Sequence, residues 1–307
     1  MMIRIFEFRL KESLLVSLLG IFVLPNSRVE SQWIQELPIE IQQSILWSAD
    51  HEEGDLSDWT FPLSKYPGGG VFNSPEKDVI ATATRNQAHS GKFSAMASIE
   101  KAVRSQNGVR AVRLMRWTDR PFDNGGNEFN NEAYYSTWMF IPDAYNPNKY
   151  APWDPGDGGW WNVFQFKAHD DEDVSQPVCS LCVGHNDQSK QLAFYLYSAI
   201  NSPSSFAQPL SIPVPINRWL HIEARYKPSF EKEGSITIWQ DGVQILDVKN
   251  IKTIVSKKHA YVVWGIGNYT DHIALGSIEG KATVYFDDAV VSIKPLSTFV
   301  SAMGRSE

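Results

Sequence analysis

Three polar side chains that could support chemistry alternate with apolar ones just after a pair of tryptophans, Trp160 and Trp161. If this segment is a β-strand, Gln165, Lys167 and His169 share one face and three apolar side chains share the other. An amide, an amine and an imidazole in one row could neutralise a carboxylate and move a proton, and the tryptophans could stack on a sugar ring. The alternative is an ordinary solvated strand face.

The elements that must position these residues are short and mostly alternating, which is typical of β-strands. Alternation is clear in Trp219–Tyr226, and Asp241-Gly242 between two apolar runs predicts a two-residue hairpin. Helical periodicity is nearly absent apart from the N-terminus and Trp33–Gln43. We therefore predict an all-β protein with two packed antiparallel sheets. The expected strands are Ser44–Trp47, Val79–Thr84, Phe93–Ile99, Val109–Trp117, Ala133–Ile141, Asn162–Ala168, Leu192–Ser198, Trp219–Tyr226, Ser235–Gln240, Val243–Asp247, Ala260–Ile266 and Thr283–Ile293.

Long loops rich in Gly, Pro, Asn and Asp interrupt this pattern at residues 64–78, 118–131 and 143–160. Loops of this length in a compact domain are usually functional or disordered. Since the third loop leads directly into the strand that carries Gln165, we expect it to form a cleft wall or a lid.

The first 31 residues resemble an export signal, because basic side chains precede an 11-residue apolar run, Leu14–Leu24, that Pro25 ends. The run is too short to span a bilayer, although an uncleaved anchor is the alternative. We expect a secreted or periplasmic protein with no membrane contact after cleavage. The expected organisation is a signal peptide (1–31), a linker (32–45), a β-domain (46–296) and a C-terminal tail (297–307).

The chain is acidic, with a net charge of −7 over 307 residues. Removal of residues 1–31 takes away four basic and three acidic side chains, which moves the charge from −7 to −8. A nucleic-acid partner is therefore excluded, because it would favour a basic surface. An acidic polysaccharide would need a locally basic cleft. The two cysteines, Cys179 and Cys182, are expected to form a local bridge or to be buried thiols, because one CxxC alone makes a poor zinc site.

A series of motifs resembles the secreted proteins grouped with heparin lyase I and glucuronan lyase. Their order along roughly residues 46–293 is more specific than any one of them. The motifs are Glu52–Trp59, His89–Lys92, Ala133–Pro142, Asn162–Lys167, Pro215–Glu223, Trp239–Gly242 and Tyr285–Ala289. The resemblance implies a concanavalin A-like β-jelly-roll sandwich and a lyase that cleaves a uronate-containing glycan by β-elimination. The implied partner is an acidic polysaccharide, and we expect a monomer.

The resemblance also implies roles for individual residues. Such a lyase must quench the uronate carboxylate, remove the C5 proton and protonate the leaving oxygen. Gln165 stands at the neutraliser position with Arg113 near it, and Tyr269 is the first choice for proton transfer. Lys167 stands where related alginate-cleaving enzymes have His, and His169 is a second choice. The expected substrate-binding residues are Arg110, Trp160, Trp161, Tyr195 and Tyr197.

Each assignment has a structural alternative. Tyr269 lies in an N-glycosylation sequon, Asn268-Tyr269-Thr270, and could be an exposed loop residue. The arginines at positions 110, 113 and 116 cannot all share one strand face. His221 and Glu223 lie on one face with Arg225 and are expected to form a polar network on the outer sheet. Because several lyase positions are altered, a non-catalytic carbohydrate-binding protein of the same fold is the alternative function.

No cofactor is expected for the chemistry, but a structural Ca²⁺ is. In jelly rolls an early Glu-Gly-Asp segment often pairs with a late Asp-Asp strand to hold calcium through carboxylate oxygens. Glu53, Asp55, Asp287 and Asp288 fit that pattern. The alternative is two acidic strand ends without a metal.

Overall fold

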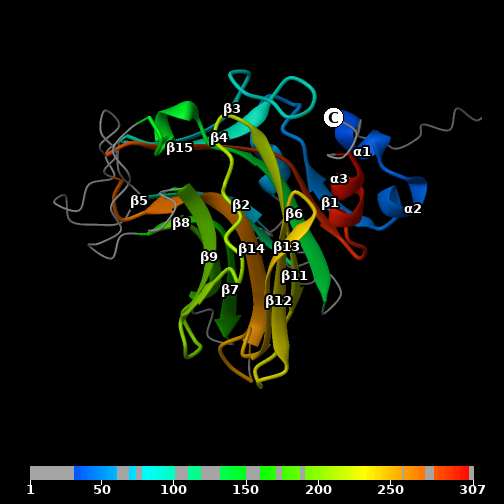
Figure 1. Cartoon of the computed structure of the whole chain (residues 1–307). Coiled ribbons are helices and arrows are strands. Elements are labelled where there is room, and N and C mark those ends of the chain that lie inside the picture. The colour runs from blue at the N-terminus through cyan, green and yellow to red at the C-terminus, as the bar shows by residue number, and fades with distance from the viewer. Residues whose placement is uncertain are drawn as a thin grey trace, which may run out of the picture.

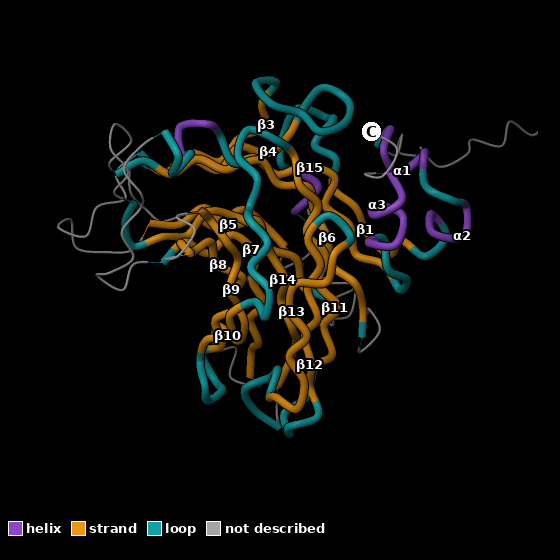
Figure 2. Tube along the Cα trace, in the orientation of Figure 1, coloured by secondary structure: helices purple, strands orange, loops and turns teal. Residues whose placement is uncertain are grey.

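Two antiparallel β-sheets pack face to face and enclose one large apolar core (Figures 1 and 2). This computed structural model describes residues 31–60, 69–73, 78–100, 110–118, 132–149, 160–170, 175–186, 191–257, 259–273 and 280–303. The all-β prediction is confirmed. No helix in these residues is long and apolar enough to cross a membrane. The expected signal peptide lies outside the described residues.

The eight-stranded sheet runs in the order β13-β12-β11-β6-β15-β4-β3, and β1 also pairs with β15. The strands are β13 (Val243–Ile251), β12 (Gly234–Gln240), β11 (Trp219–Lys227), β6 (Ala133–Phe140), β15 (Ala282–Ser292), β4 (Ser94–Ile99), β3 (Val79–Thr84) and β1 (Ile45–Ala49). The expected Asp241-Gly242 turn joins β12 to β13, and both of its residues have positive φ angles, as a tight hairpin requires.

The seven-stranded sheet runs in the order β10-β9-β8-β7-β14-β5-β2. Its strands are β10 (Ser205–Ala207), β9 (Gln191–Ser198), β8 (Ser175–Asn186), β7 (Trp161–Asp170), β14 (His259–Thr270), β5 (Arg110–Trp117) and β2 (Gly69–Asn73). Three of these, β2, β8 and β10, were not predicted from the sequence. The omission of β8 matters most, because β8 pairs with β7 along the functional row.

The core lies between the sheets and is rich in aromatic rings. Phe166 of β7 stacks on Tyr226 of β11 with ring centres 3.9 Å apart, so the contact joins the two sheets directly. Trp264 of β14 is fully buried and meets Phe164 at 5.5 Å. Burial of the Phe164, Phe166 and Ala168 side chains confirms the predicted alternation of β7 and fixes which of its faces turns outward.

Short helices from both ends of the described chain cover the outer face of the eight-stranded sheet (Figure 1). These are α1 (Gln32–Glu36), α2 (Ile39–Gln42) and α3 (Ser297–Met303). Trp33 and Ile34 of α1 pack with Val290 and Val300 in a second apolar cluster. The segments expected as a linker and a tail therefore carry packed structure, because their apolar side chains bury against β15 and β6.

The two cysteines are free buried thiols and form no bridge. Both lie on β8, three residues apart, and successive side chains of a strand point to opposite faces. Cys179 accordingly belongs to the core, whereas Cys182 lines a cavity on the outer face of the same sheet. Burial raises the pKa of each thiol to about 12.

Candidate active-site groove on the seven-stranded sheet

Two cavities adjoin on the outer face of the seven-stranded sheet, and together we call them the groove. The larger cavity has a volume of about 650 Å³ and the smaller one about 220 Å³. Arg113 of β5 and Lys167 of β7 line both cavities, so the two cations stand at their junction. The larger cavity is also lined by Trp160, Asn162, Gln165, Pro177, Ser180, Cys182, Tyr195, Tyr197, Ser204, Ser205 and Tyr269.

The middle of the groove floor is low because two glycines of β14 lie beneath it. Gly265 pairs with Gln165 on one side and with Met115 on the other, and Gly267 pairs with Arg113. A Cβ at Gly265 would lie 2.2 Å from the Met115 sulfur, and one at Gly267 would lie 2.1 Å from the carbonyl oxygen of Val112. Any side chain at these positions would therefore displace the neighbouring strand and fill the groove.

The predicted row of β7 faces the groove. Gln165 lines the larger cavity, His169 lines the smaller one and Lys167 lines both. The His169 ring is only 9% exposed and stacks on Tyr261 with ring centres 4.2 Å apart. The residue types identified from the sequence thus lie together along one wall of the groove.

The arginines of β5 point to different faces. Arg113 lines the groove, where its guanidinium carbon lies 5.3 Å from the centre of the Tyr269 ring. Arg110 and Arg116 share the opposite face with core residues such as Leu114, and Arg116 lies 5.6 Å from the Trp47 ring centre. Arg110, expected to bind substrate, is 5% exposed and does not line either cavity.

Within the described ranges, the two groove cations have no carboxylate partner. Among the described residues no acidic side chain lines either cavity, and neither Arg113 nor Lys167 forms an ion pair. Burial, and secondarily the nearby charge of Arg113, lowers the pKa of Lys167 from 10.5 to about 8. Lys167 is therefore part-deprotonated near neutral pH, and the described lining of the groove is positively charged in an acidic protein.

Gln165 can offer its amide hydrogens to a ligand. Its Nε2 atom lies 3.6 Å from the Met115 sulfur, which is a weak acceptor. Its Oε1 atom accepts a long bond, 3.5 Å, from Nδ2 of Asn162, which also donates to the Ser180 hydroxyl at 3.0 Å. The carbonyl end of the Gln165 amide is thus held by Asn162, whereas its donor end contacts only a weak acceptor within the described residues.

Tyr269 lies on β14 in the groove, not in an exposed loop. Its ring meets Trp160 edge to face with centres 4.5 Å apart. Trp160 is held in turn, because its amide N–H donates to Asp271 Oδ1 at 3.0 Å and its carbonyl accepts from the Thr270 hydroxyl at 2.7 Å. A register shift between β14 and β7 separates Ile266 from Tyr269 beside this corner of the groove.

The sequon asparagine and the second tryptophan belong to the core. Asn268 is fully buried, and its amide nitrogen donates to the carbonyls of Ala97 and Ala282 on the other sheet. Its Oδ1 atom accepts from the Trp161 indole nitrogen at 2.7 Å. The folded chain therefore hides the sequon. Trp161, expected to bind substrate, is 1% exposed and faces away from the groove, whereas Trp160 lines it.

Tyr195 and Tyr197 of β9 both line the larger cavity, as expected for substrate-binding residues. Burial and the neighbouring Cys182 thiol raise the pKa of Tyr195 well above 10, so its hydroxyl stays protonated. Tyr197 is 42% exposed and lies at the outer edge of the cavity. Two aromatic rings on β9 thus face Trp160 and Tyr269 across the sheet.

The four carboxylates expected to bind calcium differ in burial. Glu53 and Asp55 are exposed, whereas Asp287 and Asp288 of β15 are fully buried. Asp287 Oδ2 accepts from the His89 amide at 2.8 Å, and Asp288 Oδ2 lies 2.7 Å from His89 Nδ1. Imidazole is not a ligand that Ca²⁺ favours.

Within the described ranges no group of three or more His, Cys, Asp or Glu side chains is arranged to hold a metal. Calcium binding by the four carboxylates stays a prediction.

Sequence reasoning missed several groove residues. Asn162 and Ser180 fix the Gln165 amide, and Phe72, Met115 and Trp117 line the smaller cavity. Met115 and Trp117 could have been found from the sequence, because residues two and four positions after Arg113 lie on the same face of a strand. Ser180 could not, because Pro177 and Gly184 obscure its strand.

The comparisons with solved structures bear on the fold. A solved endo-β-1,4-glucuronan lyase from the fungus Trichoderma reesei is similar to the chain, with 15% identity and a TM-score of 0.56 over 82% of this chain and 96% of that one. A marine alginate lyase from Aplysia kurodai has 11% identity and a TM-score of 0.50, over 82% and 100%. A search of curated proteins finds no match.

At these identities the likeness shows the fold, and the predicted jelly-roll sandwich is confirmed. The family model described as polysaccharide lyase matches residues 51–290, which include every strand of the groove. The resemblance found in the sequence is thereby confirmed, and the chain belongs to the polysaccharide lyase family.

Proposed function

We propose that the protein is a secreted or periplasmic lyase that cleaves a uronate-containing polysaccharide by β-elimination. The observation that carries this proposal is the pair of cations, Arg113 and Lys167, at the centre of an open groove, where no described residue supplies a carboxylate partner. A half-buried cation without a partner is costly, and a uronate carboxylate would supply the missing charge.

In the proposed reaction Arg113 and the Gln165 amide hold the uronate carboxylate. This contact stabilises the negative charge that develops there as the C5–H bond breaks. Lys167 in its neutral form takes the C5 proton. The electron pair forms the C4–C5 double bond, the C4–O4 bond breaks, and the Tyr269 hydroxyl protonates the leaving oxygen.

Lys167 suits the role of the base better than its residue type alone suggests. An ordinary lysine is almost fully protonated near neutral pH, but a pKa of about 8 leaves a usable neutral fraction. The loss of solvent that lowers this pKa also strengthens every charge interaction in the groove. Tyr269 lies on β14, next to the strand of Lys167, and its ring contacts Arg113. In the proposed reaction it reaches the scissile bond from the side opposite to Lys167.

A non-catalytic carbohydrate-binding function is the second candidate. It is favoured by the aromatic lining of the larger cavity, where Trp160, Tyr195, Tyr197 and Tyr269 gather. Aromatic rings can hold sugars without chemistry. The two functions differ in one product, because only a lyase creates a C4–C5 double bond conjugated to a carboxylate.

The experiment uses the purified chain with a panel of alginate, glucuronan, heparin, heparan sulfate, hyaluronan and pectate, with and without calcium. Ultraviolet absorbance reports the conjugated double bond. We expect a rising signal that Lys167→Met abolishes and that Lys227→Met, a change of an exposed lysine on β11, leaves intact. Binding of a glycan without any absorbance would instead support the binding function.

A further inference from the structure

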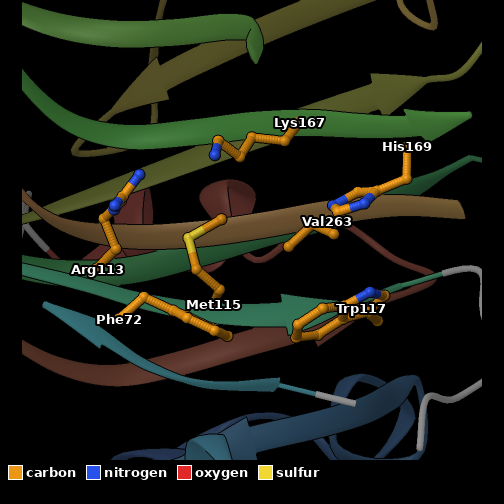
Figure 3. Close-up of a pocket in the computed structure, with 7 residues that line it drawn as sticks. All are labelled: Phe72, Arg113, Met115, Trp117, Lys167, His169 and Val263. Carbon is orange, nitrogen blue, oxygen red and sulfur yellow. The ribbon is translucent and has the colours of Figure 1, made fainter. Parts of the chain in front are cut away.

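The smaller cavity differs in chemistry from the rest of the groove. Figure 3 shows Arg113 and Lys167 together at one end, pointing toward one another, and Trp117 and His169 at the other. Between the ends lie Met115, Val263 and the ring of Phe72, which are apolar. Away from the cation pair, the described lining of this cavity therefore offers a second negative charge only the His169 imidazole.

The cavity is continuous with the proposed cleavage point, because Arg113 and Lys167 line both cavities. Its volume of about 220 Å³ lies below the roughly 300–1,000 Å³ of drug-sized pockets, so it has room for about one sugar unit. A glycan whose reacting uronate is held by Arg113 would place a neighbouring sugar here.

Charge decides which sugar fits. One carboxylate, that of the reacting uronate, is matched by Arg113 at the junction. A second carboxylate in the smaller cavity would lie against Met115, Val263 and Trp117, and burial of an unpaired charge against apolar groups is strongly unfavourable. In a polymer made only of uronates, each neighbour of the reacting unit carries such a carboxylate. This cavity therefore selects against a homopolymer.

The cavity also has features that suit an uncharged sugar. The rings of Phe72 and Trp117 lie 6.0 Å apart and can cover the apolar face of a pyranose. The Trp117 side chain is 8% exposed, and its indole N–H has no hydrogen-bond partner in the described part of the chain. A sugar hydroxyl would satisfy this donor, and the His169 imidazole stands nearby with its ring nitrogens.

We propose that the smaller cavity is a subsite for an uncharged sugar, so the substrate is a polysaccharide in which uronate and uncharged sugar units alternate. This inference rests on the proposed function of the groove and narrows it. It makes the smaller cavity, rather than the cation pair, the part of the groove that determines specificity.

The test compares kcat/KM for two kinds of polymer with the ultraviolet assay. Hyaluronan, which alternates glucuronate with N-acetylglucosamine, represents the alternating class, and glucuronan and alginate represent the uronate homopolymers. We expect at least about a tenfold preference for the alternating polymer, which corresponds to about 1.4 kcal/mol. An equal or opposite preference would overturn the subsite, yet would leave the lyase proposal standing. No product from any polymer would overturn the lyase proposal itself.

A charge inserted into the cavity sharpens the test. Phe72 lies on β2 at the edge of the sheet and is 39% exposed, so Phe72→Lys is compatible with the fold. We expect it to shift the ratio of kcat/KM toward glucuronan by about tenfold, because the new ammonium pairs with the second carboxylate. Ile80→Lys is the matched control, since Ile80 is 42% exposed on β3 of the other sheet. If both variants leave the ratio unchanged, the smaller cavity does not contact the sugar next to the reacting uronate.

Discussion

Both sheets carry polar side chains on the face that turns away from the core, but one of these faces is covered by helices and the other is open. On the eight-stranded sheet His221 and Glu223 of β11 are fully buried next to α1 and α3. Glu223 Oε2 accepts from the amides of Leu296 and Ser297, at 2.6 and 3.2 Å, where α3 begins. On the seven-stranded sheet Lys167 and its neighbours face an open groove.

The difference teaches that alternation alone does not identify a site. A strand pattern indicates which residues share a face, whereas the rest of the chain decides whether that face is covered. On one sheet the carboxylate of Glu223 has found its donors in the protein. On the other sheet the cation of Lys167 has found no carboxylate among the described residues, and this makes the groove the candidate for ligand binding.

The largest expected effect is a loss of activity when the groove face is changed. We expect Lys167→Met to reduce kcat by about 10²–10⁴-fold, because it removes the base while the similar apolar stem keeps the packing. The ultraviolet assay measures the rate, and thermal unfolding checks the fold. A variant that keeps more than a tenth of the wild-type rate would show that another group removes the proton.

Substitution of the two neighbouring tryptophans compares the core face of the seven-stranded sheet with its groove face. We expect Trp161→Ala to destabilise the protein by about 3–5 kcal/mol, because it empties a core site and leaves the Asn268 oxygen without its donor. Urea unfolding measures this free energy. A loss below about 1 kcal/mol would contradict the placement of Trp161 in the core.

A pH-dependent effect tests the covered face. Burial raises the pKa of Glu223 from 4.5 to about 7, so the folded state holds this proton more tightly than the unfolded state does. The corresponding stability is present below pH 4.5 and is lost as the pH rises through about 7.

Glu223→Gln should remove that dependence, because an amide does not titrate in this pH range. The packing is kept, since the amide oxygen can still accept from Leu296 and Ser297. Relative to the wild type we expect the variant to gain about 3 kcal/mol between acidic pH and pH 8, because the shift from 4.5 to about 7 counts about 1.36 kcal/mol per pKa unit. Urea unfolding at several pH values measures the difference. A constant difference would mean that folding does not shift the pKa of Glu223. Turnover per folded molecule serves as the control, since this face is outside the groove.

The smallest effect concerns Trp160. We expect Trp160→Ala to raise KM by about 2–10-fold and to change stability little, because the ring lines the groove and loses only a sugar-stacking contact. Steady-state kinetics separate KM from kcat. A change in kcat alone would place Trp160 with the reacting atoms, through its contact with Tyr269.

Much of the fold and part of the groove could be predicted from the sequence. The alternation after Trp161 identified Gln165 and Lys167 on one face, because a strand with a buried face has a fixed register. The sequence could not show the coverage of β11, since α1 and α3 come from distant ends of the chain. It also could not separate Trp160 from Trp161, because a partner on β14, Asn268, decides which ring turns inward.

The central claim is that the open face performs an elimination with Lys167 as base, and the pH profile of kcat/KM tests it most directly. The value of kcat/KM, measured from product absorbance, should rise with pH and level off above an apparent pKa of about 8, because only neutral Lys167 accepts the C5 proton. Activity that falls through the same pH range would contradict the account, since it would show that the charged form of Lys167 is the one that the reaction needs.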